Sequence, residues 1–241
     1  MDYLQAILIA IVEGLTEYLP VSSTAHMIFT SSFFGIQEDD FVKLFQVSIQ
    51  FGAILAVVVL YWKKFFDFSK INFYIKLACA VIPALVLGKI FDDKIDAILG
   101  NPIPIAIVLI LGGIVLLFID GRFHNPTVAN EEDITIKKAV TIGFWQCLAM
   151  MPGTSRSAAS IIGGMQQGLT RETAAEFSFF LAVPTMLAVT TYSLFLKTYE
   201  VSQLKGYELL TQSSDNLKLF FIGNIVAFVV AVIAIKFFIG I

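Results

Sequence analysis

Two short polar segments carry most of the side chains in this sequence that could do chemistry. The first runs from Glu13 to His26, and the second runs from Pro152 to Ser157. Both are set in stretches apolar enough to enter a bilayer, where a charged side chain is costly and usually marks function. Their carboxylates, hydroxyls, imidazole and guanidinium are therefore the candidate functional groups.

The first segment holds two acidic residues, Glu13 and Glu17. Four residues apart, they share one face of a helix, where two negative charges repel unless a cation or a shared proton lies between them. This spacing predicts a metal or proton site. The alternative is a pair of solvated glutamates at the membrane surface, which the apolar flanks at 7–12 and 18–21 disfavour.

A run of hydroxyls follows Pro20 at Ser22, Ser23 and Thr24. We expect these hydroxyls to cap the next helix, and the free N–H groups of a helix N-terminus bind phosphate well. His26 follows one turn later on the same face as Ser22 and Ser23, so a serine and the histidine are a candidate nucleophile and base. Helix capping alone remains the simpler explanation of Ser22.

The second segment repeats this design with the opposite charge. A turn is predicted at Pro152 and Gly153, and Thr154 or Ser155 is expected to cap the helix that follows. Arg156 then enters the first helical turn, where its guanidinium fork suits bidentate contact with phosphate. The segment is typical of an anion-binding cradle.

The charge on Arg156 has a second explanation, a buried ion pair with Glu13 or Glu17, which does not exclude function. One turn on lie Ser157 and Ser160, and the Ser160 hydroxyl is as well placed to bond a backbone carbonyl as to touch a ligand. Taken together, the groups of both segments favour phosphoryl transfer on a lipid-anchored molecule, with a metal bridging carboxylates and phosphate oxygens.

The composition indicates an integral membrane protein. Of 241 residues, 57% are hydrophobic and 15% are charged, against roughly 25% charged in soluble domains. The net charge of -3, with no polybasic run, favours no nucleic-acid partner. Cys79 and Cys147 lie in separate apolar stretches and are expected to be buried thiols, not a disulfide or metal pair.

Five apolar runs approach the length of about 20 residues that a helix needs to cross lipid. They lie at 44–61, 73–91, 103–119, 177–196 and 217–236. Two shorter stretches, 4–12 and 139–151, each end in a polar turn and are followed by a second short helix, at 23–34 and 156–168. Such broken pairs are predicted to be re-entrant and to line a cavity, since lipid cannot satisfy non-helical backbone.

This order predicts an all-α, polytopic helix bundle in one membrane domain, 1–241, with inverted-topology repeats and two re-entrant helix pairs. The first repeat covers about 1–119, and the second, about 135–241, is expected to lack a final helix. The bias of Lys and Arg slightly favours a cytoplasmic 62–72 connection, so the first pair enters from the outer face. A lipid or ion-coupled transporter or flippase is the alternative function.

Three motifs, at 13–26, 152–157 and 177–184, resemble the signatures of the undecaprenyl-diphosphatase (bacitracin-resistance) family, and the resemblance covers nearly the whole chain. It implies an enzyme that hydrolyses undecaprenyl diphosphate, a polyprenyl diphosphate lipid, and so recycles the carrier of bacterial cell-wall synthesis. It also implies a multi-pass protein of the bacterial inner (plasma) membrane, a site open to the outer face, and a divalent cation (Mg or Ca). A homodimer is left open.

The resemblance also implies roles for individual residues. The catalytic set is Ser23, His26, Glu17, Glu13 and Arg156, with the metal on Glu13 and Glu17. The substrate-binding set is Ser22, Thr24, Gly153, Thr154, Ser155, Ser157 and Ser160. Whether Ser23, His26 or water is the nucleophile stays open. The sequence departs from the family pattern at Ala25, where glycine is usual, at 158–160, and at its end, where relatives continue to one more helix.

Overall fold

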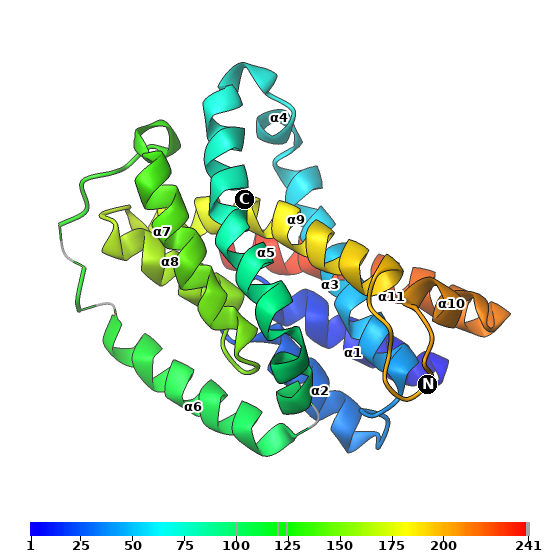
Figure 1. Ribbon diagram of the computed structural model, residues 1–241. Coiled ribbons are helices and arrows are strands. Elements are labelled where there is room, and N and C mark those ends of the chain that lie inside the picture. The colour runs from blue at the N-terminus through cyan, green and yellow to red at the C-terminus, as the bar shows by residue number, and fades with distance from the viewer. Residues whose placement is uncertain (100, 120, 124, 240–241) are drawn as a thin grey trace.

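The structure, a computed structural model, describes residues 1–99, 101–119, 121–123 and 125–239. Within these residues the protein is helical and has no β-strand longer than an isolated bridge (Figure 1). The first half contains α1 (Tyr3–Thr16), α2 (Ser23–Phe33), α3 (Asp40–Leu60), α4 (Trp62–Phe65), η1 (Phe68–Lys70), α5 (Ile71–Leu99) and α6 (Pro102–Ile119). The second contains η2 (Glu131–Asp133), α7 (Ile136–Gln146), η3 (Cys147–Met150), α8 (Arg156–Gln166), α9 (Arg171–Phe195), α10 (Gly206–Thr211) and α11 (Ser214–Ile239).

Five of these helices, α3, α5, α6, α9 and α11, are long and apolar enough to cross a membrane. They are the five predicted spans, and the chain is a multi-pass membrane protein. The predicted boundaries were too narrow because the ends of the helices are polar. The Asp39 side chain, for example, accepts a hydrogen bond from the Phe41 N–H, so α3 begins at Asp40 and not at residue 44.

Both predicted breaks are present. The chain leaves helical geometry between α1 and α2, around Pro20, and again between α7 and α8, where η3 precedes the turn at Pro152 and Gly153. Gly153 has φ +99°, which other residues rarely adopt, and a Cβ there would lie 2.5 Å from the Ile105 carbonyl oxygen of α6. In each pair the second helix packs against the first, forming a hairpin (Figure 1).

Helix α9 connects the two halves of the molecule. Its Phe179, Ala182 and Met186 belong to the apolar core formed with α1, α3 and α11. Its Phe177, Phe180 and Leu181 belong to a second core formed with α5 and α7. By contrast, α6 lies along one edge, mostly exposed, and touches α2 and α5 (Figure 1). The two hairpins therefore meet beside α9.

The turns of the two hairpins are joined directly. The Ser157 hydroxyl, in the first turn of α8, donates to the carbonyl oxygen of Leu19 in the first break at 3.0 Å. Next to Leu19, the Tyr18 hydroxyl donates to Ala53 of α3 at 3.0 Å, and its ring packs edge-on against Phe179 of α9. These contacts fix the first polar segment relative to the second.

An ion-pair cluster lies at the end of the molecule where α3 leads into α5. Lys64 of α4 lies 2.6 Å from Glu176 of α9 and 3.1 Å from Glu131 of η2, and Lys70 also contacts Glu131 at 3.1 Å. Burial alone would lower the pKa of Lys64, but its hydrogen bonds to the two glutamates outweigh burial and raise that pKa. The cluster ties the α3–α5 connection to the second half of the chain.

Candidate active site

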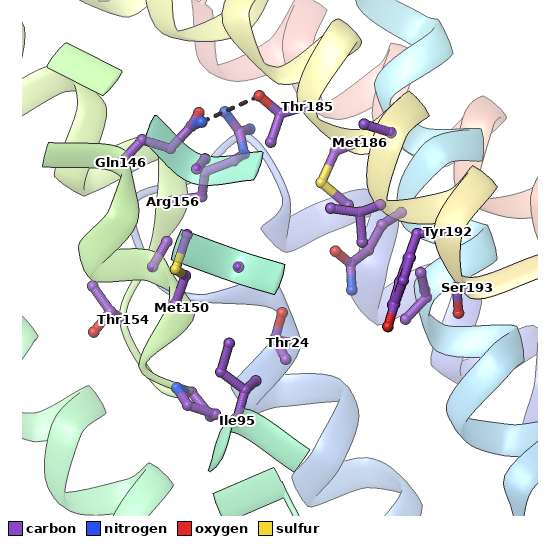
Figure 2. Close-up of a pocket in the computed structure, with 18 of the residues that line it drawn as sticks. Thr24, Ile95, Gln146, Met150, Thr154, Arg156, Thr185, Met186, Tyr192 and Ser193 are labelled. Atoms are coloured by element: carbon purple, nitrogen blue, oxygen red, sulfur yellow. Dashed lines mark hydrogen bonds between the residues drawn. The ribbon is translucent and has the colours of Figure 1, made fainter. Parts of the chain in front are cut away.

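A cavity of about 430 Å³ lies between the two hairpins, α5 and α9 (Figure 2). Eight of the predicted catalytic and substrate-binding residues line it: Glu17, Ser22, Ser23, Thr24, Gly153, Thr154, Ser155 and Arg156. Most of the remaining wall is apolar and comes from α5 and α9, including Leu85, Ile95 and Val189. The cavity thus combines a polar end with an apolar wall.

The polar end is built around one ion pair between the halves of the chain. Arg156 Nη2 lies 3.1 Å from Glu17 Oε1, and both side chains are nearly buried, at 11% and 6% exposure. Glu17 Oε2 accepts a hydrogen bond of 2.5 Å from the Ser23 hydroxyl. The buried ion pair considered from the sequence therefore exists, and it links guanidinium, carboxylate and hydroxyl in one chain of contacts.

Helices α8 and α9 orient the guanidinium. Arg156 follows Ser155, whose hydroxyl accepts from the Ala158 N–H and so caps α8 as predicted. The Arg156 Nη1 donates to the carbonyl oxygen of Ser178 on α9 at 3.2 Å, while its buried Nε has no hydrogen-bond partner among the described residues. Two of the three guanidinium nitrogens are therefore held by protein groups, one from each half of the chain.

Comparison with known proteins identifies the family. The family model described as "Bacitracin resistance protein BacA" matches residues 6–241. The chain belongs to this family. The resemblance inferred from its motifs is confirmed, because the matched residues contain all three of them.

Curated relatives of this BacA family member carry the name undecaprenyl-diphosphatase. The protein of that name from Flavobacterium psychrophilum is 56% identical over 240 residues, which cover 100% of this chain and 87% of the relative. Those from Bdellovibrio bacteriovorus and Acetivibrio thermocellus are 47% and 41% identical over 243 and 253 residues, covering 100% of this chain and 88% and 89% of the relatives.

Glu13 lies behind the ion pair and not on the cavity wall. It is fully buried, and neither carboxylate oxygen has a hydrogen-bond partner in the described part of the chain. A buried carboxylate without a partner is unstable as an anion, so it requires a proton or a cation. The metal or proton site expected from the spacing of Glu13 and Glu17 stays a prediction.

Among the described residues, no hydrogen bond joins Ser23 to His26, the candidate nucleophile and base. Ser23 is bonded to Glu17, whereas His26 Nδ1 lies 2.9 Å from the Ser22 carbonyl oxygen. His26 is also not among the described residues that line the cavity. Ser22, at φ 62°, makes no side-chain hydrogen bond to cap α2, and its buried hydroxyl has no partner within the described part of the chain. The Ser23 hydroxyl is thus directed to Glu17, although Ser23 and His26 share one face of α2.

Two further serines predicted to bind substrate point elsewhere. Ser157 bonds to Leu19, and Ser160 donates to the Arg156 carbonyl oxygen four residues earlier at 2.9 Å. Both are 1% exposed and neither is among the described residues lining the cavity. For Ser160, the backbone bond considered from the sequence is the one observed.

The structure adds polar residues that the sequence did not single out. Gln146, at the end of α7, donates from Nε2 to the Thr185 hydroxyl at 3.1 Å beside Arg156 (Figure 2). Thr185 already donates its proton to Leu181, so it can only accept from Gln146. Farther along the wall, the Tyr192 hydroxyl donates to Asp92 at 2.5 Å. An isolated Gln or Tyr in an apolar helix gave no sequence signal.

The donor set fits a hard divalent cation that also binds substrate. The described residues contain no cluster of three or more His, Cys, Asp or Glu side chains arranged to hold a metal. Magnesium, however, is commonly held by one or two carboxylates with the rest of its shell from water and substrate phosphates. Glu13, without a partner among the described residues, and Glu17, one turn away at the cavity, are the two carboxylates that would hold such an ion.

Proposed function

We propose that this protein hydrolyses undecaprenyl diphosphate to undecaprenyl phosphate and inorganic phosphate. The observation that carries the proposal is the contact of Arg156 with Glu17, one from each hairpin, at the polar end of a cavity with an apolar wall. Such a cavity suits a diphosphate headgroup joined to a hydrocarbon tail. The names of the relatives support this substrate.

The roles of the residues follow from their contacts. Arg156 and the N–H groups at the start of α8 neutralise the terminal phosphate, an effect that we expect to dominate the rate. Ser23 attacks the terminal phosphorus, its proton passes to Glu17, and the bond to the bridging oxygen breaks to release the lipid phosphate. Water then hydrolyses the phosphoserine. The position of His26 favours Glu17 over the imidazole as the proton acceptor.

We further propose that Glu13 and Glu17 hold a divalent cation in the presence of substrate. Bound there, the cation would neutralise phosphate oxygens and polarise the phosphorus. Both carboxylates are buried. A buried negative charge without a counter-charge is costly in free energy, so the pair favours a bound cation.

The cavity is proposed to open to the outer face of the bacterial inner membrane. Its wall includes Lys89 and Ile95 in the second half of α5, and Tyr192 near the end of α9. These parts lie at the opposite ends of α5 and α9 from the 62–70 connection, which carries Lys63, Lys64 and Lys70. Because basic residues favour the cytoplasmic side, the cavity end is assigned to the outer side.

Phosphate release from C55 prenyl diphosphate by the purified protein tests the proposal. We expect turnover with added magnesium or calcium and its loss with chelator. A protein that moves the lipid across liposomes without releasing phosphate would instead be the transporter considered from the sequence, which the names of the relatives do not favour. Absence of phosphate release in folded protein with either cation would refute the hydrolase assignment.

A further inference from the structure

Two buried hydroxyls behind Arg156 have no place in the chemistry described above. Ser160 lies one turn after Arg156 on α8, and Ser178 lies on α9; they are 1% and 0% exposed. Ser178 belongs to the motif at 177–184 that supported the family resemblance but was given no role. Both are absent from the described lining of the cavity, so neither is placed to touch the substrate.

These two serines make a closed set of contacts around the Arg156 backbone and guanidinium. Their hydroxyl oxygens lie 2.6 Å apart, a hydrogen bond between α8 and α9. The Ser160 hydroxyl also lies 2.9 Å from the Arg156 carbonyl oxygen, and the Ser178 carbonyl oxygen accepts from Arg156 Nη1 at 3.2 Å. Ser160 thus contacts the backbone of Arg156, and Ser178 contacts its guanidinium.

We propose that Ser160 and Ser178 are positioning residues that act together as a clasp to set the guanidinium of Arg156 for phosphate. The inference rests on the proposed function and names how one binding group of that site is held. A long arginine side chain has large conformational entropy, so a fixed carbonyl acceptor reduces the cost of presenting its fork to an anion. The hydrogen bond between the Ser160 and Ser178 hydroxyls holds α9 against α8. It thereby fixes the Ser178 carbonyl oxygen that accepts from Arg156.

Ordinary helix packing is the competing explanation. Elsewhere along the same pair of helices, Gly164 allows close approach to Ala174, and a Cβ on Gly164 would lie 2.8 Å from the Ala174 Cβ. If the serines served only such packing, their loss would affect stability and leave phosphate binding in the folded protein unchanged. The clasp instead predicts a loss of phosphate binding and a dependence of each serine on the other.

Ser48 gives a matched control for Ser160. Its hydroxyl donates to the Leu44 carbonyl oxygen four residues earlier at 2.9 Å, the same type and length of bond, and it is also 1% exposed. It lies on α3 and is not among the described residues lining the cavity. Ser48→Ala and Ser160→Ala therefore each remove a hydrogen bond to the carbonyl oxygen four residues earlier. Ser160→Ala also removes a 3.2 Å contact with the Ser157 carbonyl oxygen and the contact with Ser178.

The test compares Ser160→Ala, Ser178→Ala, their double variant and Ser48→Ala in the purified protein. For each, KM for C55 prenyl diphosphate and the inhibition constant of inorganic phosphate are measured. We expect each clasp variant to raise both constants together, by about threefold to tenfold, the range for loss of one buried hydrogen bond. In the double variant, neither constant should exceed its value in the more affected single variant. Ser48→Ala should change neither constant more than about twofold.

Two more variants keep the test decisive if alanine impairs folding. Ser160→Thr retains the hydroxyl and Ser160→Val replaces it with a methyl of the same shape, so only threonine should keep phosphate affinity. The clasp would be overturned if the fold-changes of the two single variants multiplied in the double variant. It would also be overturned if Ser160→Ala left the inhibition constant of phosphate unchanged. If the unmodified protein releases no phosphate from the lipid, the proposed function fails, and stabilisation of the variants by inorganic phosphate against heat still tests the clasp.

Discussion

Removing the Arg156 guanidinium should destabilise the fold as well as end activity, and the two effects can be separated. Arg156→Ala leaves the Glu17 carboxylate, only 6% exposed, without the guanidinium that lies 3.1 Å away. Breaking a buried pair by removing one partner costs about 3–5 kcal/mol, because a charge stays buried and unpaired. For a chain of this size, that loss corresponds to a fall in melting temperature of roughly 6–20 °C.

The double variant Arg156→Ala with Glu17→Gln separates charge burial from catalysis. It removes the unpaired charge of Glu17, so it should recover most of the lost melting temperature while phosphate release stays absent. Melting temperatures in one detergent, with phosphate release on the same samples, provide the measurement. If Arg156→Ala melts within 2 °C of the unmodified protein, the guanidinium does not compensate a buried charge. If the double variant turns over lipid, the assigned role of Arg156 is wrong.

Three other predictions concern separate parts of the molecule. Ser23→Ala should reduce phosphate release by at least about a hundredfold if its oxygen is the nucleophile; substantial remaining turnover would assign the attack to water. Gly143→Ala should destabilise the protein, because a Cβ there would lie 2.1 Å from the Ala80 carbonyl oxygen, whereas Gly112→Ala, with open space around it, should be neutral or stabilising in thermal melts. Because the pKa of Lys64 is raised in the folded protein, its charge stabilises the fold at pH values below 10.5, the ordinary pKa of lysine. Stability should therefore fall as the pH rises above 10.5, and Lys64→Met should flatten this fall in thermal melts at alkaline pH.

The helical architecture could be predicted from the sequence because lipid restricts the structures that can cross a membrane. Five apolar runs and two interrupted ones predicted the five long helices and both breaks, since a helix is the main way to cross hydrocarbon without unpaired backbone. Boundaries were missed where polar residues extend a helix beyond its apolar run. Helix α9, expected from 177, begins at Arg171, because Thr170 caps it by accepting from the Thr173 N–H.

The sequence pointed to eight of the residues that line the cavity and to an ion pair of Arg156 as one alternative, but not to the hydrogen bond between Ser23 and Glu17. Charge in an apolar stretch is visible in any sequence, which explains why Glu17 and Arg156 were found. Which group bonds the Ser23 hydroxyl depends on the geometry of a non-helical turn, where Ser22 adopts φ 62°, and helix periodicity says nothing about such a turn. Gln146 was missed for a similar reason, since its role comes from contact with Thr185 on another helix.

The ion pair also gives a physical reason for expecting a cation in the reaction. In the structure, Arg156 and Glu17 neutralise each other at the polar end of a largely apolar cavity. If a bound diphosphate pairs with the Arg156 guanidinium, Glu17 loses its counter-charge. Glu17, and Glu13 one turn away, then lie beside additional negative charge. Two buried carboxylates beside a phosphate cannot all remain anionic without a counter-charge, because their repulsion in a region of low dielectric constant is large. Substrate binding should therefore be coupled to uptake of a proton or of the divalent cation proposed for this pair, and phosphate affinity should rise with the concentration of that cation.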